Sequence, residues 1–298
     1  MQPAAIIEAP RLSSLLGTDV VIVSETFQKT GSFKFRAAYH LASNVPETLL
    51  ITASSGNFGQ ALACACSMLG KKCIVVMPQT SAQVKIEAVK AFGGQVELVD
   101  INTKSREQRV SELAADHPEA YIASAYDDAL VIAGNASLGR EIAAIDVEFD
   151  AIIVPIGGGG LSAGVLRGLR ESGNRIPVIG AEPLLGNDAA RSLRAGKLIR
   201  NENEPRTIAD GARTVSLGEL NWAILKDGIE DIIEVPEENI CEAVRLLYGL
   251  ANLKVEPTGA LSVGALLTNV ERFKEQSVCC IVSGGNVDPA VYARLICS

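Results

Sequence analysis

The chain has 298 residues, with 35 acidic and 27 basic side chains and a net charge of −8. A chain of this length can bury enough surface to fold without a disulfide or a metal, and its acidic balance argues against a nucleic-acid or anionic-membrane surface, which needs clustered Lys and Arg. Hydrophobic residues make up 48% and charged residues 21%, which excludes a disordered protein and favours a globular one.

Short apolar runs alternate with amphipathic stretches along most of the chain. Continuously apolar strands that alternate with helices are typical of parallel sheets covered on both faces. The sequence therefore predicts an α/β protein with doubly wound, mostly parallel sheets. Buried strands are expected at residues 20–24, 49–53, 73–77, 96–99, 152–156, 178–181, 232–235 and 278–283. Helices are expected between them, among others at residues 81–92, 104–115, 129–144 and 237–250.

A membrane helix is not expected, although residues 48–70 carry no charge. Polar side chains near the middle of this stretch, from Ser54 to Gln60, would lie unpaired in hydrocarbon. The N-terminus shows no secretory signal, and the seven cysteines have neither disulfide-framework nor zinc-ligand spacing. A cytoplasmic location is the simplest expectation.

The first segment that suggests chemistry is QKTGSFKFR at residues 28–36. Gly31 and Ser32 are expected to form a turn and an N-cap that open a helix. Lys34 would then lie in the first turn, where the helix dipole disfavours a cation and lowers the pKa of the amine. A nucleophilic lysine needs a lowered pKa, whereas an isolated Lys in this pattern is usually a solvated surface residue.

Two further segments follow predicted strands and open helices. Residues 54–60, SSGNFGQ, gather backbone N–H groups and two hydroxyls at one helix N-terminus, which suits a carboxylate or phosphate but is also explained by an ordinary capped turn. The glycine run at residues 157–160 lets the backbone wrap a phosphate. The same run also fits a dinucleotide fingerprint, with Glu182 as the ribose ligand.

The last segment, SGGN at residues 283–286, closes the final predicted strand and alone indicates only a turn. In chain order the segments are QKTGSFKFR, SSGNFGQ, GGGGLSAG, AEP, TIADGAR, EPTGA and SGGN. Over nearly the whole chain this series resembles the pyridoxal-phosphate enzymes of fold type II, within the threonine/serine dehydratase and serine racemase family. The resemblance implies a tryptophan synthase β-like architecture, with a large cofactor-binding domain at residues 1–48 and 127–298 and a small mobile domain at residues 49–126.

The resemblance also implies roles for individual residues. Lys34 would form the Schiff base with pyridoxal phosphate and take the proton from the substrate Cα. Ser55 would move a proton on the opposite face or only bind the substrate carboxylate. The glycine run would hold the cofactor phosphate, Asn57 the phenolic oxygen and Ser283 the pyridine nitrogen. All expected cofactor contacts are Phe33, Lys34, Asn57, Gly157, Gly158, Gly159, Gly160, Leu161, Glu256, Ser283 and Gly284. The expected substrate contacts are Ser54, Ser55, Gly56, Asn57 and Phe58.

A metal site is implied by the spacing of Glu182, Gly186 and Asp188, at which some relatives bind Mg²⁺ or Ca²⁺ through oxygen ligands. A solvated acidic loop is the alternative. Phe58 departs from the family pattern, because relatives commonly have His there. It makes the expected pocket more apolar and admits a larger β-substituent, as in phenylserine.

The implied function is removal of water from L-threonine, L-serine or a related β-hydroxy amino acid by a homodimer, giving a 2-oxo acid and ammonia. Amino-acid racemisation and dehydration of hydroxyaspartate or phenylserine are alternatives within the same family, and β-replacement is a rival reaction. An NAD-linked dehydrogenase would explain the glycine run and Glu182 but would leave QKTGSFKFR, SSGN and SGGN without a role. A cofactor-binding protein without catalysis would not need Lys34.

Overall fold

Two separate sheets organise the chain in the computed structural model, which describes residues 1–54, 56–81 and 83–297. Every pairing between the strands below is parallel except that of β1 with β2, so the predicted mostly parallel α/β fold is confirmed. The six-stranded sheet has the order β1 (Ala5–Glu8), β2 (Asp19–Ser24), β10 (Ser277–Val282), β7 (Ala151–Pro155), β8 (Val178–Pro183) and β9 (Asp231–Val235). The four-stranded sheet has the order β5 (Gln95–Val99), β4 (Lys72–Pro78), β3 (Leu49–Ala53) and β6 (Tyr121–Ile122).

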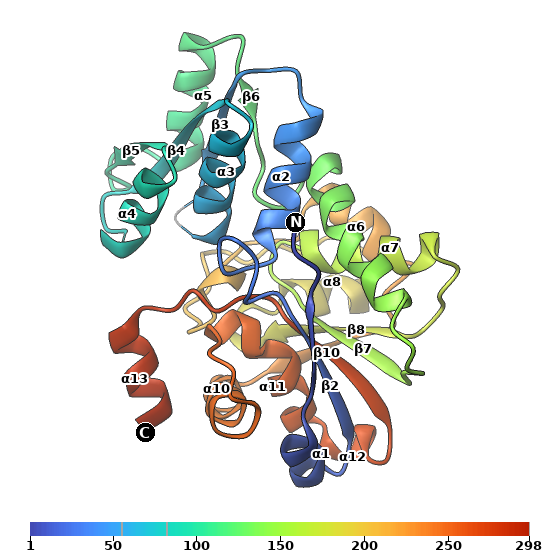
Figure 1. The fold of residues 1–298 in the computed structure, drawn as a ribbon. Helices are drawn as coiled ribbons and strands as arrows, with labels where there is room; N and C mark the ends of the chain where they lie inside the picture. The colour runs from blue at the N-terminus through green and yellow to red at the C-terminus, as the bar shows by residue number, and fades with distance from the viewer. Residues whose placement is uncertain (55, 82, 298) are drawn as a thin grey trace.

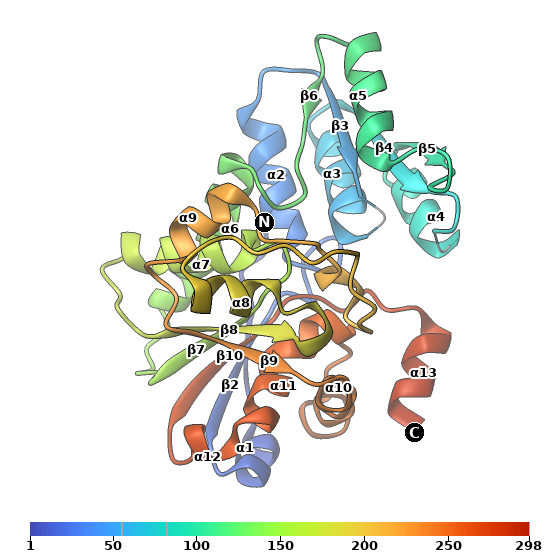
Figure 2. The same cartoon turned by 180° about the vertical axis from the view of Figure 1, so that it is seen from behind.

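The six-stranded sheet is buried on both faces, as the unbroken apolar runs of its strands predict. In β10, Val278, Cys280 and Val282 belong to the core on one face, and Cys279 and Ile281 to the core on the other. Figure 2 shows the two helical layers on either side of this sheet. One layer contains α1 (Pro10–Leu16), α10 (Glu237–Ala251), α11 (Leu261–Thr268) and α12 (Val270–Phe273), and α13 (Pro289–Cys297) packs on the same core. The other contains α6 (Ala129–Ala143), α7 (Gly160–Glu171), α8 (Asp188–Ala195) and α9 (Glu219–Leu225).

The four-stranded sheet and its helices form a second unit, drawn above the six-stranded sheet in Figure 1. Helices α2 (Lys34–Asn44), α3 (Asn57–Met68) and α4 (Gln83–Ala91) share the core on one face. Helix α5 (Arg106–Asp116) covers the other face. Because α2 packs against both α3 and α6, it stands between the two units.

The predicted strands and the four predicted helices are confirmed, with ends displaced by at most two residues. Two strands were not predicted, β1 and β6. Strand β1 is a four-residue antiparallel edge strand with alternate residues exposed, and β6 has only two residues. The four-stranded sheet draws its strands from residues 49–122 and the other sheet from both ends of the chain. The division at residues 49–126 and the mobility of the smaller part stay predictions.

The charge-free stretch at residues 48–70 folds as β3 and α3. Within the part of the chain that the structure describes, no helix is long and apolar enough to cross a membrane.

Helices α6 and α7 cross at glycines, where their backbones come into direct contact. A Cβ at Gly139 would overlap the carbonyl oxygen of Val165, and one at Gly168 would overlap that of Ala136. The close approach of these two helices therefore depends on residues without a side chain.

We expect Gly139→Ala to lower the free energy of unfolding by roughly 1–3 kcal/mol, because the added methyl group forces the two helices apart. The matched control is Gly249→Ala in α10, where a Cβ would meet nothing within 4 Å. That change should be neutral or stabilise the protein by up to about 1 kcal/mol, since Ala is the better helix former. Urea denaturation followed by circular dichroism measures both. Equal effects at the two positions would contradict the packing argument.

Candidate active site

A cavity of about 670 Å³ is lined by residues of both sheet units. The cavity lies where strands end. Ser54 directly follows β3, Ser283 directly follows β10, and one residue separates Gly157 from the end of β7; all three residues line the cavity. The carboxyl ends of parallel strands are the usual binding edge of an α/β sheet. The expected site residues that line the cavity are Phe33, Lys34, Ser54, Gly56, Asn57, Phe58, Gly157, Gly158, Gly159, Gly160, Leu161, Glu256 and Ser283. Ser55 lies outside the described residues.

Lys34 is the first residue of α2 and therefore lies in the first turn of the helix, as predicted. Its Nζ donates a hydrogen bond to the Ala125 carbonyl oxygen at 2.6 Å and lies 4.9 Å from the centre of the Phe33 ring and 5.7 Å from that of Phe58. Burial lowers the pKa of Lys34 to about 8, while the nearby Glu256 carboxylate opposes this shift. The direction is the predicted one, but the main cause is burial rather than the helix dipole. The amine is therefore easier to deprotonate than that of an ordinary lysine.

The turn before Lys34 is held against the end of β10. Gly31 has a φ of +71°, which only glycine adopts readily, and Ser32 pairs with Gly284 in an isolated bridge. The Phe33 N–H donates to the Ser283 carbonyl oxygen at 2.9 Å. The turn at Gly31 is thus confirmed, but the expectation that Ser32 caps the helix is wrong, because Phe33 occupies the N-cap. The Ser32 hydroxyl is buried and has no hydrogen-bond partner among the described residues.

The glycine run opens α7 in a conformation that larger residues could not reach. Gly159 is the N-cap with a φ of +91°, and a Cβ at Gly158 would overlap the Tyr126 ring. Asn221 supports the loop from behind, because its Nδ2 donates to the Gly158 carbonyl oxygen at 2.7 Å. The first N–H groups of a helix have no partner inside it, so this turn offers donors to an anion in the cavity.

The turn after β3 is organised by Ser54. Its Oγ accepts hydrogen bonds from the Gly59 N–H at 3.1 Å and the Gly56 N–H at 3.4 Å. Asn57 begins α3 and lines the cavity. Phe58 differs from the expectation, because its side chain is only 1% exposed and packs in the core of the smaller unit. It therefore offers little apolar surface to a ligand, although it borders the cavity.

Four segments distant in sequence meet in one chain of hydrogen bonds beside the cavity. Asn57 Nδ2 donates to Glu256 Oε1 at 2.8 Å, and Asn57 Oδ1 accepts from Asn286 Nδ2 at 2.8 Å. Asn286 Nδ2 also donates to the Thr30 carbonyl oxygen at 2.6 Å. Burial raises the pKa of Glu256 to about 8, with a smaller contribution from the Asp210 carboxylate. Gly284 does not line the cavity; it lies behind, where a Cβ would crowd Glu256 Oε1 at 2.6 Å.

The residues of the predicted metal site lie apart from the cavity lining. The Glu182 carboxylate accepts from the N–H groups of Ala189 at 2.8 Å and Ala190 at 2.9 Å. The Asp188 carboxylate accepts from Asn201 Nδ2 at 2.9 Å and from a backbone N–H of residue 217 at 3.0 Å. Burial raises the pKa of both carboxyls, that of Asp188 to about 6. Over residues 1–54, 56–81 and 83–297, no three His, Cys, Asp or Glu side chains are grouped to hold a metal, and the metal site stays a prediction.

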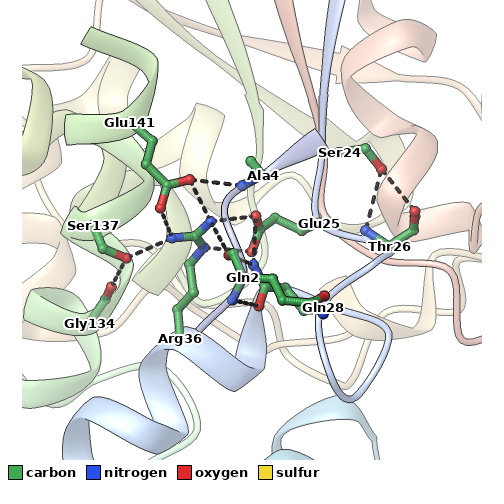
Figure 3. A network of polar contacts seen from close by, with 10 residues as sticks. All are labelled: Gln2, Ala4, Ser24, Glu25, Thr26, Gln28, Arg36, Gly134, Ser137 and Glu141. Carbon is green, nitrogen blue, oxygen red and sulfur yellow. Dashed lines mark hydrogen bonds and ion pairs between the residues drawn. The ribbon is translucent and has the colours of Figure 1, made fainter. Parts of the chain in front are cut away.

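Arg36 lies two residues after Lys34 and is fully buried, with its guanidinium between two carboxylates (Figure 3). It donates to Glu25 at 2.7 and 2.8 Å and to Glu141 at 2.6 and 2.8 Å. Ser137 Oγ accepts another bond at 3.0 Å, and Glu141 also accepts from the Ala4 N–H at 2.9 Å. This network joins the lysine-bearing helix to α6, to the loop after β2 and to the N-terminal segment.

Sequence reasoning missed several charged and aromatic residues of the cavity wall. They are Lys85, Arg106, Glu107, Tyr126, Arg200, Glu204, Asp210 and Arg213. Asp210 and Arg213 lie within the TIADGAR segment, to which no site role was assigned, and the others lie outside the quoted segments. Lys85 on α4 forms an ion pair with Asp210 of the six-stranded unit at 2.7 Å, so it bridges the two units beside the cavity.

Residues 1–284 match the model of a protein family described as pyridoxal-phosphate dependent enzyme. The chain is 35% identical to the L-threo-3-hydroxyaspartate ammonia-lyase of Saccharomyces cerevisiae, over 96% of this chain and 88% of the relative. It is also 35% identical to the serine racemase of Schizosaccharomyces pombe, over 93% of this chain and 87% of the relative. A solved T.th. threonine deaminase has a TM-score of 0.89 and 38% identity, covering 96% of this chain and 93% of that one. Maize serine racemase has a TM-score of 0.92 and 31% identity, covering 98% and 90%.

We expect Arg36→Met to lower the free energy of unfolding by about 3–5 kcal/mol, because it leaves the Glu25 carboxylate buried without its partner. Adding Glu25→Gln should recover part of that loss. The control is Arg194→Met, which removes an ion pair with Glu234 whose arginine side chain is 58% exposed and should cost about 0–1 kcal/mol. Urea denaturation measures all four proteins, including wild type. Similar losses at positions 36 and 194 would show that burial of the network adds nothing.

The lowered pKa predicts how the Lys34 amine reacts with pH. In the cofactor-free protein, the rate at which a small amount of acetylating reagent modifies Lys34 should reach half its maximum near pH 8 and level off above that, because the neutral amine is the nucleophile. Mass spectrometry of the Lys34 peptide follows the reaction, and Lys34→Ala identifies that peptide. A rate at Lys34 that keeps rising well beyond pH 9 would contradict the effect of burial.

Proposed function

The chain belongs to the family of pyridoxal-phosphate dependent enzymes, and from that premise we propose that it removes water from a β-hydroxy amino acid to give a 2-oxo acid and ammonia. The observation that carries the proposal is Lys34, a lysine with a lowered pKa that shares one cavity with the glycine loop at the start of α7. The serine racemase relatives make amino-acid racemisation the second candidate.

The cavity fits this cofactor on its own geometry. The glycine loop lies against Tyr126, where a Cβ at Gly158 would overlap the ring, and the N–H groups at the start of α7 suit a phosphate. Asn57 has a second Nδ2 hydrogen available for an acceptor in the cavity. Ser283, at the end of β10, supplies a neutral hydroxyl rather than a carboxylate. We propose that these residues hold the phosphate, the phenolic oxygen and the ring nitrogen, respectively.

When bound, the cofactor supplies an electron-withdrawing ring that stabilises negative charge at the substrate Cα. The turn at Ser54, Gly56 and Asn57 binds the substrate carboxylate at the N-terminus of α3. Lys34, as a neutral amine, takes the proton from Cα. The bond between Cβ and the hydroxyl oxygen then breaks, and the hydroxide leaves as water with the proton that Lys34 took from Cα. The released enamine is hydrolysed in solution to the 2-oxo acid and ammonia.

The partner of the ring nitrogen favours elimination. A carboxylate would keep that nitrogen protonated, whereas the neutral Ser283 hydroxyl leaves it largely unprotonated. Negative charge on the ring is then less stabilised, so reactions in which the charge departs with a β-substituent are favoured. This supports dehydration over reactions that need a long-lived carbanion.

The charges of the cavity wall bear on the substrate side chain. Arg106, Arg200 and Arg213 line the cavity, and among the described residues no carboxylate is paired with any of them. Three acidic residues also line the cavity, Glu107, Glu204 and Asp210. Of these, Asp210 forms an ion pair with Lys85. Such arginines suit a second carboxylate on the substrate. Since a relative is named L-threo-3-hydroxyaspartate ammonia-lyase, we propose hydroxyaspartate as a substrate beside serine and threonine. Phe58, buried in the core, gives phenylserine little support.

We further propose a cytoplasmic homodimer in which the smaller unit closes over the substrate. The seven cysteines are all free, which supports a reducing compartment. The Lys85–Asp210 ion pair supports closure, because it already joins the two units beside the cavity. The dimer is proposed from the family resemblance, and light scattering on the purified protein measures it.

The test is to add pyridoxal phosphate to the purified protein and to Lys34→Ala, and then to supply L-serine, L-threonine or L-threo-3-hydroxyaspartate. Wild type should show the visible absorption of the bound cofactor and release a 2-oxo acid, with the highest kcat/KM for hydroxyaspartate. Lys34→Ala should lose about 10³-fold or more in rate, because it lacks the base, while the surface control Lys226→Ala should behave as wild type.

Three outcomes separate the candidates. Absorption with no 2-oxo acid, but with D-amino acid found by chiral chromatography, would replace dehydration by racemisation. A higher kcat/KM for serine or threonine would overturn the dicarboxylate preference while leaving dehydration intact. Failure of wild type to bind the cofactor at all would overturn the proposed function.

A further inference from the structure

We propose that Asn286 is a positioning residue, whose amide group fixes the Asn57 side chain so that Asn57 can only donate a hydrogen bond into the cavity. The inference rests on the proposed function, in which the acceptor facing Asn57 is the phenolic oxygen of the cofactor. Asn286 itself does not line the cavity, so it acts through Asn57.

The hydrogen bonds around Asn57 leave its amide one orientation. Two donors point at Asn57 Oδ1, Asn286 Nδ2 at 2.8 Å and Gln60 Nε2 at 3.2 Å, and together they occupy both of its lone pairs. On the other side Asn57 Nδ2 donates to Glu256 Oε1 at 2.8 Å. An amide nitrogen carries two hydrogens, so one remains for the cavity.

A rotated amide would be opposed at its contacts with Asn286 and Gln60. It would place the Asn57 NH₂ group against the NH₂ groups of both side chains and would lose the hydrogen bond that Asn57 Nδ2 donates to Glu256 Oε1. Buried polar groups that face a like partner lose a hydrogen bond and gain repulsion. Asn57 is therefore held as a donor toward the cavity, which suits an oxygen acceptor and rejects a donor.

Asn286 orients Asn57 more strongly than Gln60 does, because a further hydrogen bond holds the Asn286 side chain in place. Its Nδ2 also donates to the Thr30 carbonyl oxygen at 2.6 Å, four residues before Lys34. The neighbouring Gly31 makes room for it, since a Cβ there would overlap Asn286 Oδ1. One side chain thus joins the turn that leads to Lys34 with the first residue of α3.

The test measures the affinity of the cofactor-free protein for pyridoxal phosphate by absorption titration, which is independent of catalysis. Asn286→Ala should weaken binding about tenfold, because Asn57 loses a fixed orientation. Asn286→Asp should weaken it more, since its carboxylate would face the oxygens of Thr30 and Asn57. Gln60→Ala is the matched control: it removes the longer bond to the same atom but no link to Thr30, so its effect should be smaller.

A double-mutant cycle with Asn57→Ala decides whether Asn286 acts through Asn57. In the Asn57→Ala background, Asn286→Ala should change the affinity by less than about twofold. An undiminished effect there, or wild-type affinity in Asn286→Ala alone, would overturn the inference. Urea denaturation of each cofactor-free variant checks its fold, and Asn286→Ser replaces Asn286→Ala in the cycle if the latter unfolds. Failure of wild type to bind the cofactor would instead count against the proposed function.

Discussion

The site depends on a constraint of parallel sheets, which gather the carboxyl ends of their strands at one edge. Strands β3, β7 and β10 all end at the cavity, and the segments that follow them supply Asn57, the glycine run and Ser283. Helices α3 and α7 start from these segments, so two helix N-termini open at the same cavity. Each of the two sheets contributes one of these anion-binding turns. The distance between the two turns therefore depends on how the two units pack against each other.

Helix α2 places Lys34 in the cavity, although the start of the helix and the burial of the lysine are both energetically unfavourable. Its N-cap has no side-chain hydrogen bond, and burial disfavours the charge on Lys34. The same helix supplies Arg36, whose guanidinium binds two carboxylates, Glu25 and Glu141, and a hydroxyl. A buried ion network of this kind costs much to break, whatever its net contribution to stability. It therefore holds α2 between the two units and keeps the lysine in place.

The sequence alone predicted those parts of the protein that a short stretch of residues specifies. Apolar runs located the central strands, and the motifs located Lys34, Asn57 and the glycine loop. The edge strand β1 and the two-residue β6 escaped, because such short strands are specified by their neighbours rather than by their own pattern. The role of Asn286, the last residue of the SGGN segment, was not predicted, since its contact with Asn57 spans 229 residues of sequence. The dinucleotide interpretation needed Glu182 as the ribose ligand beside the glycine run. Glu182 does not line the cavity, however, and its carboxylate accepts hydrogen bonds from N–H groups in the first turn of α8.

The two titratable groups nearest the proposed chemistry influence each other. Burial moves both toward their neutral forms, so the pKa values of Lys34 and Glu256 meet at about 8. An ionised Glu256 raises the pKa of Lys34 and so partly opposes the effect of burial on the lysine. Lys85 lowers the pKa of Glu256 and Asp210 raises it, and these two residues come from different units. The pKa of Glu256 therefore depends on one charged side chain from each unit, and these two side chains are paired with each other beside the cavity.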